Sequence, residues 1–203
     1  MRTTLKSIFL AALLVQAGPT FAQETQNEDQ AETTEQSNEA ASDLSLGEPV
    51  GPQVGQPYIL SESGDWQTRC IKAPEGQDDS CNLYQLLLDA DGNQVSEVSV
   101  FRLPDGGNIV AGAEVVVPLE TLLTQQLTLT VDSGEARRYP FTFCNTAGCV
   151  ARVGFTQAEV DQLKRGNSAR LRLVPAAAPD QEVLLTMSLS GFTAAFDNVT
   201  AIR

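Results

Sequence analysis

The chain has 203 residues, of which 42% are hydrophobic and 19% charged, and its 26 acidic against 13 basic residues give a formal net charge of −13. That balance opposes binding to nucleic acids and to anionic lipid surfaces, which both attract clustered lysine and arginine. The chain contains no histidine, which excludes Ser-His-Asp and Cys-His catalytic arrangements and the commonest general base near neutral pH.

The first residues have the pattern of a secretory signal peptide. Arg2 and Lys6 precede an apolar run over residues 8–17, and small residues end at Ala22. The run is much shorter than the roughly twenty residues that a membrane-spanning helix needs. We therefore expect a cleaved signal over residues 1–22, export to an oxidising compartment, and a mature chain without an integral membrane span.

Residues 23–57 are predicted to form a disordered acidic linker. The part over residues 23–48 has no lysine, arginine or aromatic residue and carries eight carboxylates. So little apolar surface cannot offset the conformational entropy of folding, and glycine and proline continue the loop to residue 57. Residues 58–203 remain, enough for one domain with its own hydrophobic core.

Apolar and polar residues alternate along much of this domain, which is typical of half-buried antiparallel strands. The clearest runs are residues 127–132, 168–174 and 183–189. Asp-Gly at residues 91–92 and Ser-Gly at 133–134 predict hairpin turns between strands. The sequence therefore predicts a mainly β single domain, an antiparallel β-sandwich or barrel-like fold with one or two short helices.

One helix is predicted to begin after Thr156. Glu159 follows three residues later, which makes a capping box, and lysine and arginine come at the other end, where they suit the helix dipole. Gly166 is expected to close the helix in the left-handed conformation. A second, shorter helical turn is expected after Pro118.

The chain has four cysteines, Cys70, Cys81, Cys144 and Cys149, which allow three disulfide pairings. The short separations of 11 and 5 residues favour Cys70–Cys81 and Cys144–Cys149. The spacing and the absence of histidine do not fit a zinc site. Thiol–disulfide catalysis at Cys144 and Cys149 is an alternative, but the two lie between strand-like runs and not at a helix start, where reactive thiols are usually activated.

Three aromatic residues form a candidate binding surface: Tyr58, Tyr84 and Trp66, the only tryptophan. An exposed aromatic ring could stack on a sugar or contact a protein partner. For Trp66 the favoured interpretation is a core residue packed beside a disulfide, as in many β-sandwiches. No motif for a nucleotide, a metal or another cofactor is present, so we expect no cofactor and no catalytic residues.

Five motifs occur in order along the domain: GDWQTRC at residues 64–70, SCNLYQ at 80–85, VVVPLETLL at 115–123, YPFTFCNTAGCVARVGF at 139–155 and LTMSLSGFTAAFD at 185–197. Together they resemble the invasion-associated locus B family of secreted bacterial proteins, over about residues 64–199. The resemblance implies a small envelope or exported protein, and its namesake is associated with invasion of host red cells. The family offers no catalytic residues that could be carried to this chain.

These observations lead to one expected function and two alternatives. We expect a non-enzymatic periplasmic envelope protein, outer-membrane-associated or secreted, that interacts with a protein or envelope component and supports host-cell adhesion or invasion. The first alternative is a module that binds glycan or peptidoglycan fragments through the aromatic residues. The second is a thiol–disulfide enzyme.

Overall fold

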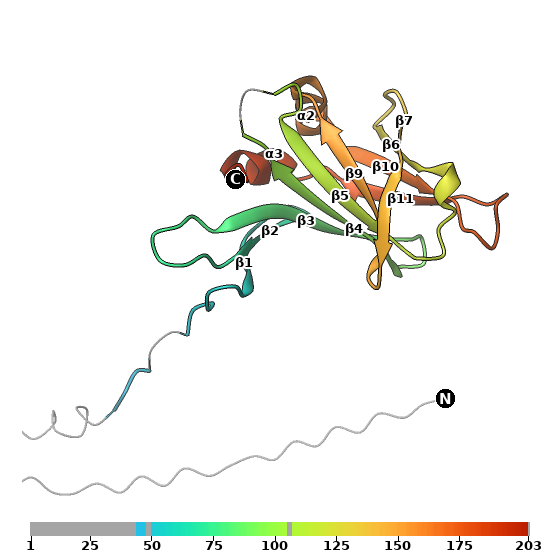
Figure 1. Cartoon of the computed structure of the whole chain (residues 1–203). Helices are drawn as coiled ribbons and strands as arrows, with labels where there is room; N and C mark the ends of the chain where they lie inside the picture. Colours follow the sequence, from blue (N-terminus) through green and yellow to red (C-terminus); the bar gives the residue numbers. More distant parts are fainter. Residues whose placement is uncertain (1–43, 48–49, 105–106, 203) are drawn as a thin grey trace, which may run out of the picture. The chain divides into compact units, whose positions relative to one another are not determined.

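The computed structural model describes residues 44–47, 50–104 and 107–202 (Figure 1). The predicted signal peptide and residues 23–43 of the predicted linker lie outside the described residues. Contacts within the chain divide it into two units, Met1–Glu48 and Pro49–Arg203. All the strands and helices below belong to the second unit.

Within the described residues, two antiparallel sheets form the fold (Figure 1). The larger has seven strands in the order β1-β2-β3-β4-β5-β9-β8, and the smaller has four in the order β11-β10-β6-β7. Their bounds are β1 Pro57–Ser63, β2 Trp66–Ile71, β3 Ser80–Leu88, β4 Gln94–Arg102, β5 Ala111–Val117, β6 Leu127–Val131, β7 Arg137–Tyr139, β8 Phe141–Asn145, β9 Gly148–Phe155, β10 Ser168–Leu173 and β11 Val183–Ser188. Both sheets keep open edges, so the fold is a sandwich and not a closed barrel.

This architecture confirms the predicted fold class. The three alternating runs are β6, β10 and β11, and the two predicted turns connect the antiparallel hairpins β3–β4 and β6–β7. Alternation places one face of each strand in the core: Trp66, Thr68 and Cys70 of β2 are buried, whereas Gln67 and Arg69 face the other side of the sheet. Each fully buried large apolar side chain contributes about 1.5–3 kcal/mol of transfer free energy.

The predicted helix is α2, Gln157–Arg165. Its capping box is present: the Glu159 amide donates to the Thr156 side chain, and the Thr156 amide donates to the Glu159 carboxylate at 2.8 Å. The prediction of a left-handed conformation for Gly166 is wrong, because this residue has an extended backbone with φ −75° and ψ 163°. After Pro118 the structure has only a single 3-10 turn, η1, Leu123–Gln125.

A second α-helix, α3 (Phe192–Asn198), follows β11 and was not located from the sequence. It lies beside α2 at one end of the sandwich (Figure 1), where Lys164 of α2 forms an ion pair with Asp197 of α3. Phe192, Ala195 and Phe196 are buried. The helix has only seven residues, and an isolated helix of that length is unstable in water, so this burial is what stabilises it.

Both disulfides join residues that lie directly opposite each other on neighbouring antiparallel strands. Cys70 pairs with Cys81 across β2 and β3, and Cys144 with Cys149 across β8 and β9. The Cα atoms are 4.0 Å apart in each pair, close to the spacing of a non-hydrogen-bonded antiparallel pair. Each bond therefore holds the register of its two strands, which sets the side chains that face the core.

Candidate functional site

A cleft of about 550 Å³ opens where β2 and β3 of the larger sheet approach β11 of the smaller one. Its walls come from the end of β1, the β1–β2 turn and these three strands. The residues that line it are Glu62, Gly64, Asp65, Trp66, Gln67, Arg69, Tyr84, Gln85, Leu86, Leu88, Thr186 and Ser188. The cleft therefore combines carboxylates, an arginine and amides with two leucines.

The floor of the cleft is organised by the buried carboxamide of Gln85. Its Nε2 donates to the carbonyl oxygens of Asp65 and Ser188 at 3.2 and 3.1 Å, and its Oε1 accepts from the Ser188 amide at 2.8 Å. The two bonds to Ser188 are those that a peptide group of a neighbouring strand would make. One side chain of the larger sheet thus completes the edge of the smaller sheet at Ser188.

Trp66 lies beneath the same point and is fully buried. Its Nε1 donates to the Ser188 carbonyl oxygen at 2.8 Å, and its ring packs edge-on against Phe192 with 5.3 Å between centroids. The alternative interpretation, in which Trp66 presents an exposed ring to a ligand, is not supported, because the inward face of β2 directs the ring into the core. The favoured interpretation holds: Trp66 is a core residue on the same face of β2 as Cys70.

Tyr84 borders the cleft but does not present a free ring. The Arg69 guanidinium carbon lies 3.2 Å from the centroid of the Tyr84 ring, and only 9% of Tyr84 is exposed. Arg69 is itself oriented by Gln67, whose Oε1 accepts from Nε at 3.1 Å and from Nη2 at 2.9 Å. Burial raises the pKa of the Tyr84 phenol, and the nearby Glu97 carboxylate raises it further. The cleft thus offers a fixed guanidinium above the covered ring.

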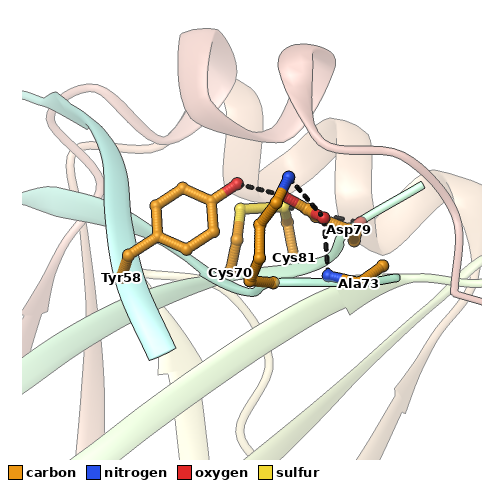
Figure 2. Close-up of polar contacts among 6 residues, drawn as sticks. Tyr58, Cys70, Ala73, Asp79 and Cys81 are labelled. Carbon is orange, nitrogen blue, oxygen red and sulfur yellow. Dashed lines mark hydrogen bonds and ion pairs between the residues drawn. A yellow bond between two sulfur atoms is a disulfide. The ribbon is translucent and has the colours of Figure 1, made fainter. Parts of the chain in front are cut away.

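Tyr58, the third predicted aromatic, does not line this cleft. It lies opposite Cys70 in β1 and borders a separate hollow of about 370 Å³. Figure 2 shows its hydroxyl pointing past the Cys70–Cys81 disulfide toward Asp79. The hydroxyl donates to the Asp79 carboxylate, which also accepts from the Ala73 amide at 2.7 Å. The three aromatic residues therefore do not form one surface.

The Tyr58–Asp79 bond makes a pH-dependent contribution to stability. Donation by Tyr58 is the main cause that lowers the pKa of Asp79 below its ordinary 3.8, and the same bond raises the pKa of Tyr58 above 10.0. At a pH between the lowered pKa of folded Asp79 and 3.8, the unfolded state binds more protons than the folded state. The stability from this bond is therefore fully present above pH 3.8 and is lost as the pH falls through the folded-state pKa of Asp79. Tyr58 keeps its proton to a higher pH in the folded state than in the unfolded state. Its contribution to stability is therefore complete below pH 10.0 and is lost as the pH rises through the raised pKa of Tyr58.

The measurement is urea unfolding of the wild type and of Tyr58→Phe across this pH range. We expect the wild type to be more stable by a constant amount between about pH 5 and 9, and this difference to shrink toward both extremes. A difference that does not change with pH would contradict the assigned bond.

Within residues 44–47, 50–104 and 107–202, no group of three or more histidine, cysteine or carboxylate side chains is placed to hold a metal ion. In the same part of the chain, no helix is long and apolar enough to cross a membrane. Cys144 is exposed and Cys149 is buried in the β8–β9 hairpin.

Gln85 was not predicted as a site residue from the sequence. A signal was present: Gln85 shares the inward-facing positions of β3 with Cys81, Leu83 and Leu87, and a polar residue in such a set needs buried hydrogen-bond partners. Its partner, Ser188, lies 103 residues away. Alternation alone could therefore indicate that Gln85 is bonded in the core but could not indicate to what.

Comparisons with known proteins place the chain in a family. Residues 66–200 match the family model described as invasion associated locus B (IalB) protein. Proteins of two Brucella abortus strains, 2308 and biovar 1 strain 9-941, both named invasion protein B homologs, are each 28% identical over 140 residues, which cover 68% of this chain and 77% of theirs.

The fold is also similar to a solved structure, the crystal structure of the invasion associated protein B from Bartonella henselae. The match has a TM-score of 0.57 and 26% identity, and it covers 66% of this chain and 90% of the other. The motifs behind the resemblance include residues 64–66 and Ser188, which line the cleft. Because the family model spans more than half of its residues, this protein belongs to the invasion associated locus B family.

Proposed function

We propose that this protein is an exported, non-enzymatic binding protein of the bacterial envelope, which contacts a partner protein through the cleft and supports host-cell adhesion or invasion. A cleaved signal over residues 1–22, an acidic linker over 23–57 and a binding domain over 58–203 suit this role. Support comes from the invasion-associated names of the relatives and from two disulfides, which are typical of exported proteins. The periplasm is the first location on this proposal, with outer-membrane association or secretion beyond it.

The observation that carries the proposal is the make-up of the cleft. Leu88 is 47% exposed at its rim, and the Arg69 guanidinium is held in place above Tyr84. Protein interfaces combine such apolar contacts with arginine and a polar rim. The floor is rigid because Gln85 and Trp66 are bonded across the two sheets, and a preorganised surface loses less conformational entropy when a partner binds.

The same geometry ranks the alternatives lower. A glycan-binding module at this cleft needs an accessible aromatic face, but Trp66 is buried, Tyr84 is covered by Arg69 and Tyr58 lies outside the cleft. A thiol–disulfide enzyme would act at Cys144–Cys149, a bond within a β-hairpin and not at a helix start. Insulin reduction by the purified protein above background would contradict the non-enzymatic assignment.

The test is a deletion strain complemented with single-site variants. Leu88→Glu places a charge at the rim of the cleft, and we expect it to reduce host-cell invasion about tenfold, the effect of losing about 1.4 kcal/mol of binding free energy. Leu119→Glu is the matched control, because Leu119 is 57% exposed outside the cleft. It should leave invasion at the wild-type level.

Circular dichroism must first show that both variants are folded. Equal invasion by the wild type, Leu88→Glu and the deletion strain would overturn the proposed function.

A further inference from the structure

Among the described residues the two sheets have four edge strands, and three of them are protected against pairing with another chain. The edge strand β1 begins with Pro57 and has a register shift in its pairing with β2. The β8 edge also has a register shift, and β7 has only three residues, two of them arginine. Prolines, bulges, charges and short length are the usual means by which edges avoid unwanted pairing.

The fourth edge, β11, has none of these features. Its sequence, VLLTMS, has no charge and no proline, and all six residues pair with β10 without a register shift. A regular, uncharged edge of this length is a template for another strand.

Hydrogen bonds show which groups lie on this edge. The Ser188 amide and carbonyl point away from β10 and are bonded by Gln85 and Trp66. The next amide, that of Leu189, donates toward the other side, to Asn167 at 3.1 Å. Because successive residues of a strand alternate between its two sides, Thr186 and Leu184 present their N–H and C=O groups on the same outer edge as Ser188. In the described part of the chain, β11 pairs only with β10.

The cleft lies along this edge. Thr186 lines it from β11, and Leu86 and Leu88 line it from β3. The last residue pair between β2 and β3 is Gln67 with Tyr84. Leu86 and Leu88 of β3 therefore lie beyond the end of β2. The cleft of about 550 Å³ is therefore bordered by two strand edges, and an extended peptide is the shape that both can bind.

We propose that an extended segment of a partner protein, with acidic side chains on its outward face, adds as a strand to the edge of β11. This inference rests on the proposed function and specifies its binding mode. Arg170 lies directly opposite Thr186 on the outward face, and Arg172 lies opposite Leu184. Outward side chains of an added strand would lie within reach of these long side chains, which favours carboxylates.

The same two arginines oppose a second copy of this chain as the occupant. If β11 strands of two copies paired with each other, the added strand would bring no carboxylate to Arg170 and Arg172, because β11 has no charged residue. Among the described residues, Arg172 has an ion pair, in which its Nη2 lies 2.6 Å from Oε1 of Glu182, and no ion pair is seen for Arg170.

The test uses a matched pair of variants at one edge position of the full-length mature protein. Thr186→Pro removes the outward N–H, and Thr186→Val retains it. The probe is a ten-residue peptide of alternating glutamate and valine with blocked ends. We expect the dissociation constant to rise about tenfold or more for Thr186→Pro and to change less than about twofold for Thr186→Val. Equal binding by the two variants, or no binding to the wild type, would overturn the proposal.

Hydrogen exchange of the wild type decides the question if Thr186→Pro does not fold. Addition of the peptide should slow exchange of the Leu184 and Thr186 amides and leave the β1 edge unchanged. Unchanged exchange at both amides with the peptide at saturation would exclude strand addition at β11.

A second pair of peptides tests whether binding requires acidic side chains. A lysine–valine peptide should bind more weakly than the glutamate–valine peptide, and Arg170→Glu should reverse this order. Equal binding of the two peptides to the wild type would overturn the acidic specificity. A wild type that sediments as a dimer while Thr186→Pro sediments as a monomer would identify a second copy as the occupant and overturn the proposed partner.

Failure here is distinguishable from failure of the proposed function. If Leu88→Glu abolishes invasion while Thr186→Pro and Thr186→Val both support it fully, the cleft acts without strand addition. If none of the three variants affects invasion, the cleft has no role and both proposals fail.

Discussion

Replacement of Gly191 by alanine is expected to lower the free energy of unfolding by about 3–5 kcal/mol, among the largest effects for a one-carbon change. Gly191 has φ 83° at the start of α3, and a Cβ there would lie 1.9 Å from the Ser63 carbonyl oxygen. That obstacle is backbone, so it cannot rotate away. The variant must separate the β1–β2 turn from the start of α3, which also disturbs the floor of the cleft.

Gly76→Ala is the matched control. Gly76 has nearly the same backbone angle, φ 81°, but a Cβ there would meet nothing within 4 Å. Only the intrinsic strain of a left-handed alanine remains, about 1–2 kcal/mol. Urea unfolding followed by the fluorescence of Trp66, the single tryptophan, measures both variants. Equal losses of stability would show that close packing against Ser63 is not the reason for glycine at position 191.

The second large effect is expected for Trp66→Ala, which should lower the free energy of unfolding by about 3–5 kcal/mol. The change leaves a cavity beside Phe192 and removes the indole donor to the Ser188 carbonyl oxygen. Trp66→Phe separates the two contributions, because it retains most of the apolar contact and loses the hydrogen bond. It should cost about 1–2 kcal/mol.

Thermal unfolding followed by circular dichroism suits these variants, which lack the fluorescent residue. A Trp66→Phe variant as unstable as Trp66→Ala would assign the effect to the hydrogen bond and not to packing. Wild-type stability in both would contradict the central position of Trp66 in the core.

The GDW and SGF motifs lie far apart in the sequence but meet in the structure, through contacts of Gln85, Trp66 and Gly191. The β1–β2 turn and the β11–α3 connection approach so closely that glycine is needed at Gly64 and Gly191, where a Cβ would collide with backbone of the other segment. Trp66 and Gln85 then bond to Ser188 across the two sheets. These residues position the cleft, and the resemblance to the family rests in part on them.

By itself the sequence determined the features that depend on near neighbours. Period-two alternation identified β6, β10 and β11, turn dipeptides identified two hairpins, and Thr156 with Glu159 identified the start of α2. Each of these signals acts over a few residues, so it survives without knowledge of the rest of the chain.

Only the tertiary structure decided which side chains are accessible and which edge is open. The Trp66 ring packs against Phe192 and donates to Ser188, 122 residues away, and Tyr84 is covered because its neighbouring strand supplies Arg69. The short helix α3 exists because the core buries its aromatic residues. The open edge of β11 follows from the order of strands in two sheets. The physical reason is common to all four: burial and strand order arise from contacts between segments far apart in the chain, which no local pattern encodes.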